Sequence, residues 1–347
     1  MTLRLWLTRP SGAKKDWEAF AMRRLRPVPG LAGLVSLGVV GLAVLAGTAL
    51  PEAPPVARTD SSTSVVSPMN RIAFVQRVFS ESHINLMDRN GSNIVELTGP
   101  RTKSPTFTPD GRRIVFAKWS RQGADLWIID TTGQHLEQLT SAPVRDADPS
   151  VSPDGTLIAF TSNRGPGHGV YVMTVKGEVK GPPAKRLARG WNPAFATDGR
   201  HILYTRRTDQ VSHLWVMHLD GTHRHQLTTS PSNDYDPAYS PDGRRIVYVR
   251  DRAIWLMRSD GTRQHAITAP HYWDSQPAFS PNGKQVVFAR VNYVRYSNIV
   301  RKPARMASHS KVLTKYPHAW SIDDYQPAWW GPTLLRDSRT FSFIRGG

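Results

Sequence analysis

Aspartates recur at one position of a repeated, proline-containing motif, and carboxylates gathered in this way would bind cations. Asp146, Asp234, Asp274 and Asp324 each stand three residues before a proline, while Thr102 and Gly190 hold that position in two further copies. Hard carboxylate oxygens suit Ca²⁺, and they would equally hold a peptide that carries Lys or Arg. The alternative is local, because Asp before X-Pro commonly starts a turn and accepts backbone N–H bonds.

Aromatic side chains accompany these aspartates. They are Trp191, Tyr235, Trp273 and Tyr325, with Tyr272 beside them. Such rings offer flat, amphipathic surfaces to a peptide or a sugar ring. Packing between neighbouring repeats is the alternative use of the same side chains.

The sequence lacks the usual arrangements for covalent or metal catalysis. It contains no cysteine, and the region after residue 51 has no G-x-S-x-G nucleophile motif. His223 and His225 are the closest histidine pair in that region, but they flank Arg224 at a turn and have no H-E-x-x-H context. We therefore expect no enzyme, no metal centre and no cofactor, apart from Ca²⁺ at the aspartates as an open alternative.

The motif belongs to a unit that recurs six times. It reads PTFTPDG at 105–111, PSVSPDG at 149–155, PAFATDG at 193–199, PAYSPDG at 237–243, PAFSPNG at 277–283 and, in a degenerate copy, PAWWGP at 327–332. Successive leading prolines lie 44, 44, 44, 40 and 50 residues apart. A period of about 40–45 residues is typical of propeller blades.

Each unit predicts a four-stranded antiparallel sheet. Alternating apolar segments such as 114–116 and 246–248 follow the first turn, and a second turn such as Asp220-Gly221 follows a strand such as HLWVMH. Asp-Gly and Asn-Gly supply the positive φ values that tight hairpins need. One such sheet cannot bury both of its faces, whereas sheets stacked radially around an axis can.

The two ends of the repeat region complement one another. Residues 70–98 supply three strands of a unit and lack the proline-containing strand, and 327–330 supply that strand alone. We predict an all-β fold: a six-bladed β-propeller over 69–332, closed by the C-terminal strand joining the N-terminal blade, and preceded by one transmembrane helix.

The repeated pattern, PxFSPDG followed by IxF, LWxMxxDG and LT, resembles the WD40-like PD40 repeat of the TolB-like six-bladed propeller family. The resemblance covers residues 69–332 and implies that the proline-containing strand lines a central channel, with the aspartates at one mouth. It leaves function open, because such repeats occur in envelope scaffold proteins, in the propellers of prolyl-oligopeptidase-like enzymes and in polysaccharide lyases. TolB proteins carry an α/β domain before the propeller, where this sequence has an apolar segment and a tether.

The N-terminal region predicts a membrane anchor. The run 31–50 is apolar and long enough to cross about 30 Å of hydrocarbon as a helix. Seven basic residues precede it, so the positive-inside rule places the tail 1–30 in the cytoplasm and the chain from residue 52 onward outside. The alternative is a signal peptide cleaved near Ala49 and secretion of the rest. Residues 51–68 form a Pro/Ser/Thr-rich tether, and 333–347 form a C-terminal tail.

The chain is strongly basic, with 45 Lys and Arg against 27 Asp and Glu. Part of this charge falls in the irregular sixth unit, where residues 289–320 predict a protruding basic flap that would meet anionic lipid or a wall polymer. Its candidate contact residues are Arg295, Arg301, Lys302, Arg305 and Lys311. A solvated loop is the alternative, and an exported domain argues against nucleic acid as the partner.

These observations favour a non-enzymatic binding or scaffold module of the cell envelope. We expect a single-pass membrane protein whose monomeric propeller, in the periplasm or its equivalent, engages a protein, peptide or wall polymer at the channel mouth. Two alternatives stay open: a lyase-like enzyme acting on polyanionic polysaccharides, and a membrane sensor that signals through its basic cytoplasmic tail.

Overall fold

The computed structural model describes residues 71–291, 297–305, 309–314 and 322–330. All of them belong to the second of two units into which the chain divides, Thr63–Gly347. The predicted tail 1–30, membrane segment 31–50, tether 51–68 and C-terminal tail 333–347 lie outside the described residues. Within those ranges, no helix has the length and apolar character needed to cross a membrane.

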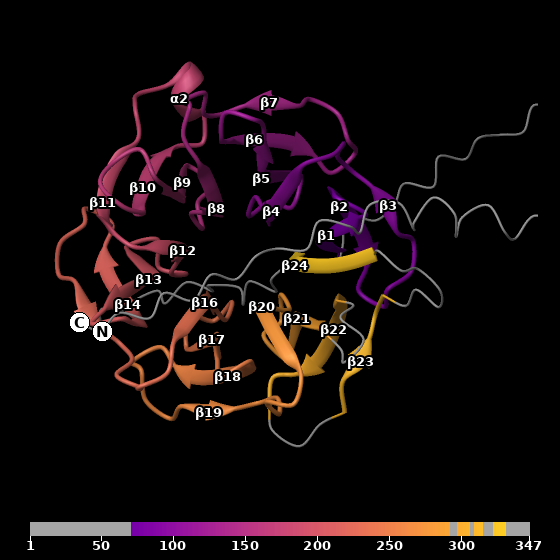
Figure 1. The fold of residues 1–347 in the computed structure, drawn as a ribbon, viewed down its shortest axis with the longest axis vertical. Coiled ribbons are helices and arrows are strands. Elements are labelled where there is room, and N and C mark those ends of the chain that lie inside the picture. The colour runs from indigo at the N-terminus through magenta and orange to yellow at the C-terminus, as the bar shows by residue number, and fades with distance from the viewer. Residues whose placement is uncertain (1–70, 292–296, 306–308, 315–321, 331–347) are drawn as a thin grey trace, which may run out of the picture. The chain divides into compact units, whose positions relative to one another are not determined.

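Six four-stranded antiparallel sheets surround a central axis (Figure 1). Blade 1 contains β24 (Ile322–Trp330), β1 (Arg71–Val78), β2 (Glu81–Asp88) and β3 (Val95–Glu96). Blade 2 contains β4 (Thr102–Phe107), β5 (Arg113–Trp119), β6 (Ala124–Asp130) and β7 (Glu137–Gln138). Blade 3 contains β8 (Asp146–Val151), β9 (Leu157–Ser162), β10 (Gly169–Thr174) and β11 (Lys185–Arg189), with the short helix α2 (Gly177–Lys180) before β11.

The remaining blades repeat this order. Blade 4 contains β12 (Trp191–Phe195), β13 (His201–Thr208), β14 (Val211–His218) and β15 (His225–Gln226). Blade 5 contains β16 (Asp234–Tyr239), β17 (Arg245–Arg250), β18 (Ala253–Arg258) and β19 (His265–Ala266). Blade 6 contains β20 (Trp273–Phe279), β21 (Gln285–Val291), β22 (Ser297–Pro303) and β23 (Lys311–Val312). The first strand of each sheet lies nearest the axis, and in blade 1 this place belongs to β24 (Figure 1).

The predicted propeller and its closure are confirmed. β24 pairs antiparallel with β1, with Trp330 opposite Arg71 and Asp324 opposite Gln76. The last described strand of the chain therefore completes the blade that the first three strands begin. This pairing joins the ends of the ring by main-chain hydrogen bonds.

The recurring SPDG turn explains why β16 reverses sharply into β17. The Ser240 hydroxyl donates to the Asp242 carboxylate at 2.5 Å, and the same carboxylate accepts the Arg244 N–H at 3.1 Å. Gly243 has a φ of 69°, a conformation that glycine adopts without steric cost. Equivalent contacts recur at Thr108–Asp110, Ser152–Asp154 and Ser280–Asn282. The turn that marks each repeat in the sequence is thus a self-contained hydrogen-bonded unit.

The apolar core consists of layers between neighbouring blades. On β17, Ile246 and Tyr248 pack toward blade 4, while Val247 and Val249 pack toward blade 6. All four side chains are fully buried. Since successive strand residues point to opposite faces, a continuous apolar run serves both neighbours. Six such layers, one for each pair of adjacent blades, hold the ring together.

Candidate functional site

A ring of six polar residues lines the central channel. Each stands immediately before the repeat proline, and the members are Ser104, Asp148, Asn192, Asp236, Gln276 and Gln326. Together with the six prolines they enclose a cavity of about 150 Å³. All six are half-buried, and all six prolines are buried. The channel is therefore narrow and polar where the inner strands approach one another.

An unusual backbone conformation creates this ring. Each of the six residues has a φ between 49° and 53°, in the left-handed region. At the same place the innermost strand shifts its register against its neighbour, as between Tyr235 and Ala238 in blade 5. Such a bulge reorients a side chain, and here the channel-facing residue of every blade coincides with it. Rigid proline follows each left-handed residue and limits the backbone on that side.

Hydrogen bonds connect the ring from blade to blade. Gln326 is the best-connected member: its backbone N–H donates to Gln276 Oε1 at 2.9 Å, and its side-chain Oε1 accepts the Ser104 N–H at 2.8 Å. The Ser104 hydroxyl donates to Asp148 Oδ1 at 3.1 Å, and Asn192 Nδ2 donates to Asp236 Oδ1 at 2.8 Å. These contacts satisfy polar groups that face the axis and fix their orientation.

Thr161 completes the connection on one side of the ring. Its hydroxyl oxygen accepts the Asn192 N–H at 3.0 Å and forms a hydrogen bond with the Asp148 carboxyl. On the other side, the Gln276 N–H donates to the Asp236 carboxyl. The channel wall is thus one hydrogen-bonded circuit that all six blades share.

The two carboxyl groups of the ring, Asp148 and Asp236, have raised pKa values. Desolvation and the nearby Asp148 charge raise the pKa of Asp236 to about 7, against the opposing hydrogen bond from Gln276. Desolvation also raises the pKa of Asp148, while hydrogen bonds from Ser104 and Thr161 oppose the change. Near neutral pH the channel therefore carries less negative charge than its two aspartates would suggest.

The four aspartates singled out from the sequence do not line this channel, so the predicted carboxylate ring is wrong. Asp146, Asp234, Asp274 and Asp324 are all fully buried. Asp234 forms a bidentate pair with Arg250, at 2.6 and 2.8 Å, and Asp274 forms the same pair with Arg290, at 2.6 and 2.7 Å. In both blades the arginine stands directly opposite the aspartate on the adjacent strand. These carboxylates neutralise arginines instead of facing a ligand.

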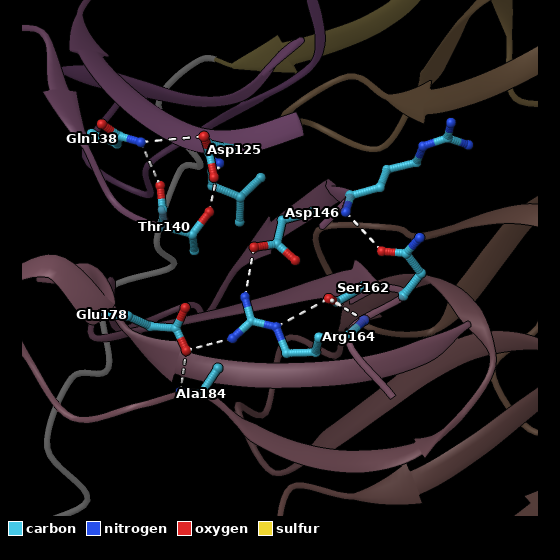
Figure 2. A network of polar contacts seen from close by, with 11 residues as sticks. Asp125, Gln138, Thr140, Asp146, Ser162, Arg164, Glu178 and Ala184 are labelled. Carbon is cyan, nitrogen blue, oxygen red and sulfur yellow. Dashed lines mark hydrogen bonds and ion pairs between the residues drawn. The ribbon is translucent and has the colours of Figure 1, made fainter. Parts of the chain in front are cut away.

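The remaining two aspartates have different partners. Arg164 bridges Asp146 and Glu178, with both N–O distances at 2.6 Å (Figure 2). Burial raises the pKa of Asp146, while hydrogen bonding to Ser162 and the Arg164 charge oppose this. Asp324 accepts a long hydrogen bond of 3.4 Å from Gln76 Nε2, the side chain opposite it on β1. The contacts of Asp234 and Asp274 reach the adjacent strand and are therefore not the local turn caps considered from the sequence.

The aromatic set divides into two groups. Tyr235 packs against the apolar layer between blades 5 and 6, and Tyr325 packs against the layers on both sides of blade 1. Trp273 is 54 % exposed, with the Arg252 guanidinium 4.4 Å from its ring centre. Trp191 is half-buried and lines a pocket at the channel mouth. A ligand role for Trp191 and Trp273 stays a prediction, while the two tyrosines serve packing between blades.

The predicted basic flap is also corrected. Residues 297–303 and 311–312 form β22 and β23, the third and fourth strands of blade 6. Lys302 is buried, so it is not available to an anionic surface. Arg301 is half-buried and donates to the Arg89 carbonyl at 2.7 Å, while Arg305 and Lys311 are exposed. Arg295 lies outside the described residues.

A pocket at the mouth is basic and aromatic. It has a volume of about 850 Å³, extends over blades 2, 3 and 4, and meets the channel ring at Ser104, Asp148 and Gln326. Lys103, Arg145, Arg189 and Arg207 contribute its cationic side chains. Sequence reasoning missed these residues because they do not form one repeated set: Arg145 and Arg189 stand four residues before the repeat proline, whereas Lys103 and Arg207 occupy two other positions. The channel ring, by contrast, had a signal: the residue before the proline is polar in all six copies.

The described residues contain no group of three or more His, Asp or Glu side chains placed to hold a metal ion. His223 and His225 lie in the turn and short strand at the outer part of blade 4, as expected of turn residues. His223 stacks on His218, with ring centres 4.3 Å apart. Neither histidine lines the mouth pocket.

The sequence matches the family model for the TolB β-propeller domain, PD40, over residues 59–187 and 184–331. The chain belongs to the PD40 TolB β-propeller family. A search of curated proteins found no match. The matched stretches include all six leading prolines, which confirms the resemblance drawn from the repeats.

Solved structures share the fold at low sequence identity. TolB from Acinetobacter baumannii is 20 % identical with a TM-score of 0.65, and the match covers 75 % of this chain and 66 % of that one. A putative TolB from Agrobacterium tumefaciens is 19 % identical with a TM-score of 0.58, covering 75 % and 99 %. Hydrazine synthase from Kuenenia stuttgartiensis is 16 % identical with a TM-score of 0.62, covering 76 % and 47 %. This PD40 propeller therefore shares its scaffold with proteins of different kinds.

The buried pair of blade 5 yields a stability prediction. Asp234→Asn should lower the free energy of unfolding by about 3 kcal/mol, because it leaves the buried Arg250 guanidinium without a compensating charge. The double variant Asp234→Asn/Arg250→Met should recover part of this loss. Urea unfolding of the wild type and both variants measures the effect. The exposed Asp209→Asn is the control, and an Asp234→Asn variant as stable as this control would contradict the pairing.

The channel carboxyl of Asp236 yields a pH prediction. Because folding raises its pKa to about 7, protonation stabilises the fold, and this contribution is lost as the pH rises from about 4 through 7. Asp236→Asn should match the wild type near pH 4 and exceed its unfolding free energy by about 4 kcal/mol at pH 8. The control is Asp242→Asn, at a turn where hydrogen bonds from Ser240 and Arg244 outweigh burial and lower the Asp242 pKa. Its pH trend should run the other way, and parallel trends would refute the assignment.

Proposed function

We propose that this PD40 propeller is a non-enzymatic binding module of the cell envelope that engages a protein or peptide partner at the channel mouth. The observation that carries the proposal is the pocket of about 850 Å³ that opens over blades 2 to 4 and continues into the polar ring. Its volume is within the range of pockets that enclose a ligand or a short chain segment. Membership of the TolB propeller family supports an envelope location.

Binding accounts for the residues of this site better than catalysis. The polar groups of the ring are engaged with one another across blades, as in the Ser104–Asp148 and Asn192–Asp236 contacts. Such an arrangement gives a rigid wall that holds its shape while a ligand docks. The cationic residues of the pocket are arginines and a lysine, which suit recognition of charged groups.

Cross-linking in intact cells tests the role of the mouth. We expect a photoreactive phenylalanine derivative at Trp191, which lines the pocket, to yield a defined adduct with an envelope protein. The same residue at Arg200, exposed at the other end of blade 4, is the matched control. Mass spectrometry identifies the adducts. No adduct from residue 191, or the same set of adducts from both positions, would reject binding at the mouth.

The proposal includes a membrane anchor at 31–50, a cytoplasmic tail at 1–30 and a propeller outside the membrane. The chain has no cysteine, so a single introduced cysteine reports location without interference. We expect Ser141→Cys, exposed on the propeller, to react with a membrane-impermeant maleimide in intact cells. Ser11→Cys should react only after lysis. Equal protection of both positions before lysis would place the propeller inside the cell, contrary to the proposal.

A further inference from the structure

Four cationic side chains crowd one half of the propeller mouth. Lys103 comes from blade 2, Arg145 and Arg189 from blade 3, and Arg207 from the end of β13 in blade 4. The three arginines are exposed and Lys103 is half-buried, and all four line the same pocket. The pocket therefore concentrates positive charge over three consecutive blades.

These four charges have no carboxylate partner among the residues that the structure describes, in contrast to three other arginines of the propeller. Arg164, Arg250 and Arg290 each form an ion pair of 2.6 Å with the buried aspartate of their own blade. No ion pair joins Lys103, Arg145, Arg189 or Arg207 to Asp or Glu within the described ranges. The propeller thus neutralises one set of cations internally and leaves another open to solvent in a pocket.

Two blades lack the buried aspartate, and both contribute to this pocket. Their equivalent residues are Thr102 and Gly190, and each stands beside a residue of the pocket, Lys103 and Trp191. Gly190 has a φ of 152°, and a Cβ there would lie 2.5 Å from the Thr205 carbonyl oxygen. No side chain fits this position, so an acidic residue cannot neutralise the mouth from here.

Contacts with Trp119 hold two of the cations in place. The Arg145 guanidinium lies 4.6 Å from the ring centre, and Lys103 Nζ lies 5.3 Å from it. Cation–π contact favours this placement. Burial lowers the Lys103 pKa, and the Arg77 and Arg145 charges lower it further. The clustered like charges repel one another, and an anionic ligand would relieve that repulsion.

The floor and rim of the pocket add two carboxylates. Asp148 lies where the pocket meets the channel ring, and Asp209 lies at the β13–β14 turn. A polyanion of uniform charge, such as a phosphate polymer, would be repelled at both points and has no donors to offer them. A peptide can place acidic side chains against the arginines and turn its backbone N–H groups toward Asp148 and Asp209. The mixed lining therefore favours a peptide.

We propose that the pocket formed by Lys103, Arg145, Arg189 and Arg207 binds an acidic peptide segment of the partner. The inference rests on the proposed function, because it names the chemistry of the segment that docks at the mouth. Arginine forks bind carboxylates in bidentate geometry. The acidic side chains lie over blades 2 to 4, and the peptide backbone faces the channel ring.

Fluorescence anisotropy with the full chain in nonionic detergent tests this pocket. The probe is a labelled peptide of alternating glutamate and serine, and the matched probe replaces each glutamate by glutamine. The double variant Arg145→Gln/Arg207→Gln should weaken binding of the glutamate peptide by about tenfold or more. The control Arg112→Gln/Arg200→Gln makes the same charge change at exposed residues beside the Asp-Gly turns, on the opposite face. It should change affinity by less than about twofold.

Three outcomes would overturn the proposal. The first is equal weakening by the two double variants, which would reduce the effect to net charge. The second is equal binding of the glutamine peptide. The third is a phosphate polymer that binds more tightly than the glutamate peptide and loses its affinity in Arg145→Gln/Arg207→Gln, which would make the pocket a polyanion site. A residue-191 adduct that persists unchanged in this variant would refute the acidic segment while leaving binding at the mouth intact.

Discussion

The structure depends on one constraint: each four-stranded sheet must bury both of its faces. A single blade cannot do this, since its strands are short and its own hydrogen bonds leave two apolar surfaces exposed. On β17, Tyr248 and Val249 are adjacent in sequence, yet they pack against different neighbouring blades. Every blade is therefore stabilised by the two beside it. The ring must also close, which explains why β24 pairs with β1 across almost the full length of the described chain.

Closing the ring brings six inner strands toward one axis, where polar backbone and side chains need partners. The left-handed residue before each proline meets this need by turning one polar side chain toward its neighbours. Ser104, Asp148 and Gln326 illustrate the result, because each is bonded to a residue from an adjacent blade. The polar groups of the channel wall are consequently hydrogen-bonded to one another. The raised pKa of Asp236 follows from its desolvated position in this wall.

The charge at the mouth differs from blade to blade, and one repeat position shows the difference. In blades 5 and 6 the residue three positions before the proline is aspartate, and it forms a buried ion pair with the arginine that faces it on the adjacent strand. Where this position holds Thr102 or Gly190, no such pair forms and the neighbouring surface remains basic. The pocket over blades 2 to 4 includes both blades of this second kind, with blade 3 and its paired Asp146 between them.

The repeat spacing, the turn chemistry and the incomplete end units were sufficient to predict six blades and their closure from the amino-acid sequence. These features are local: Asp-Gly turns and alternating apolar residues act within about ten residues of chain. Tertiary structure alone determined which repeat position faces the axis, because the bulge at residues such as Asp236 interrupts the alternation of side-chain direction along the strand. It also determined that Asp234 forms an ion pair with Arg250, whose side chain reaches it from the adjacent strand. The mouth pocket could not be read from any single repeat, since its cations come from three blades that only the closed ring brings together.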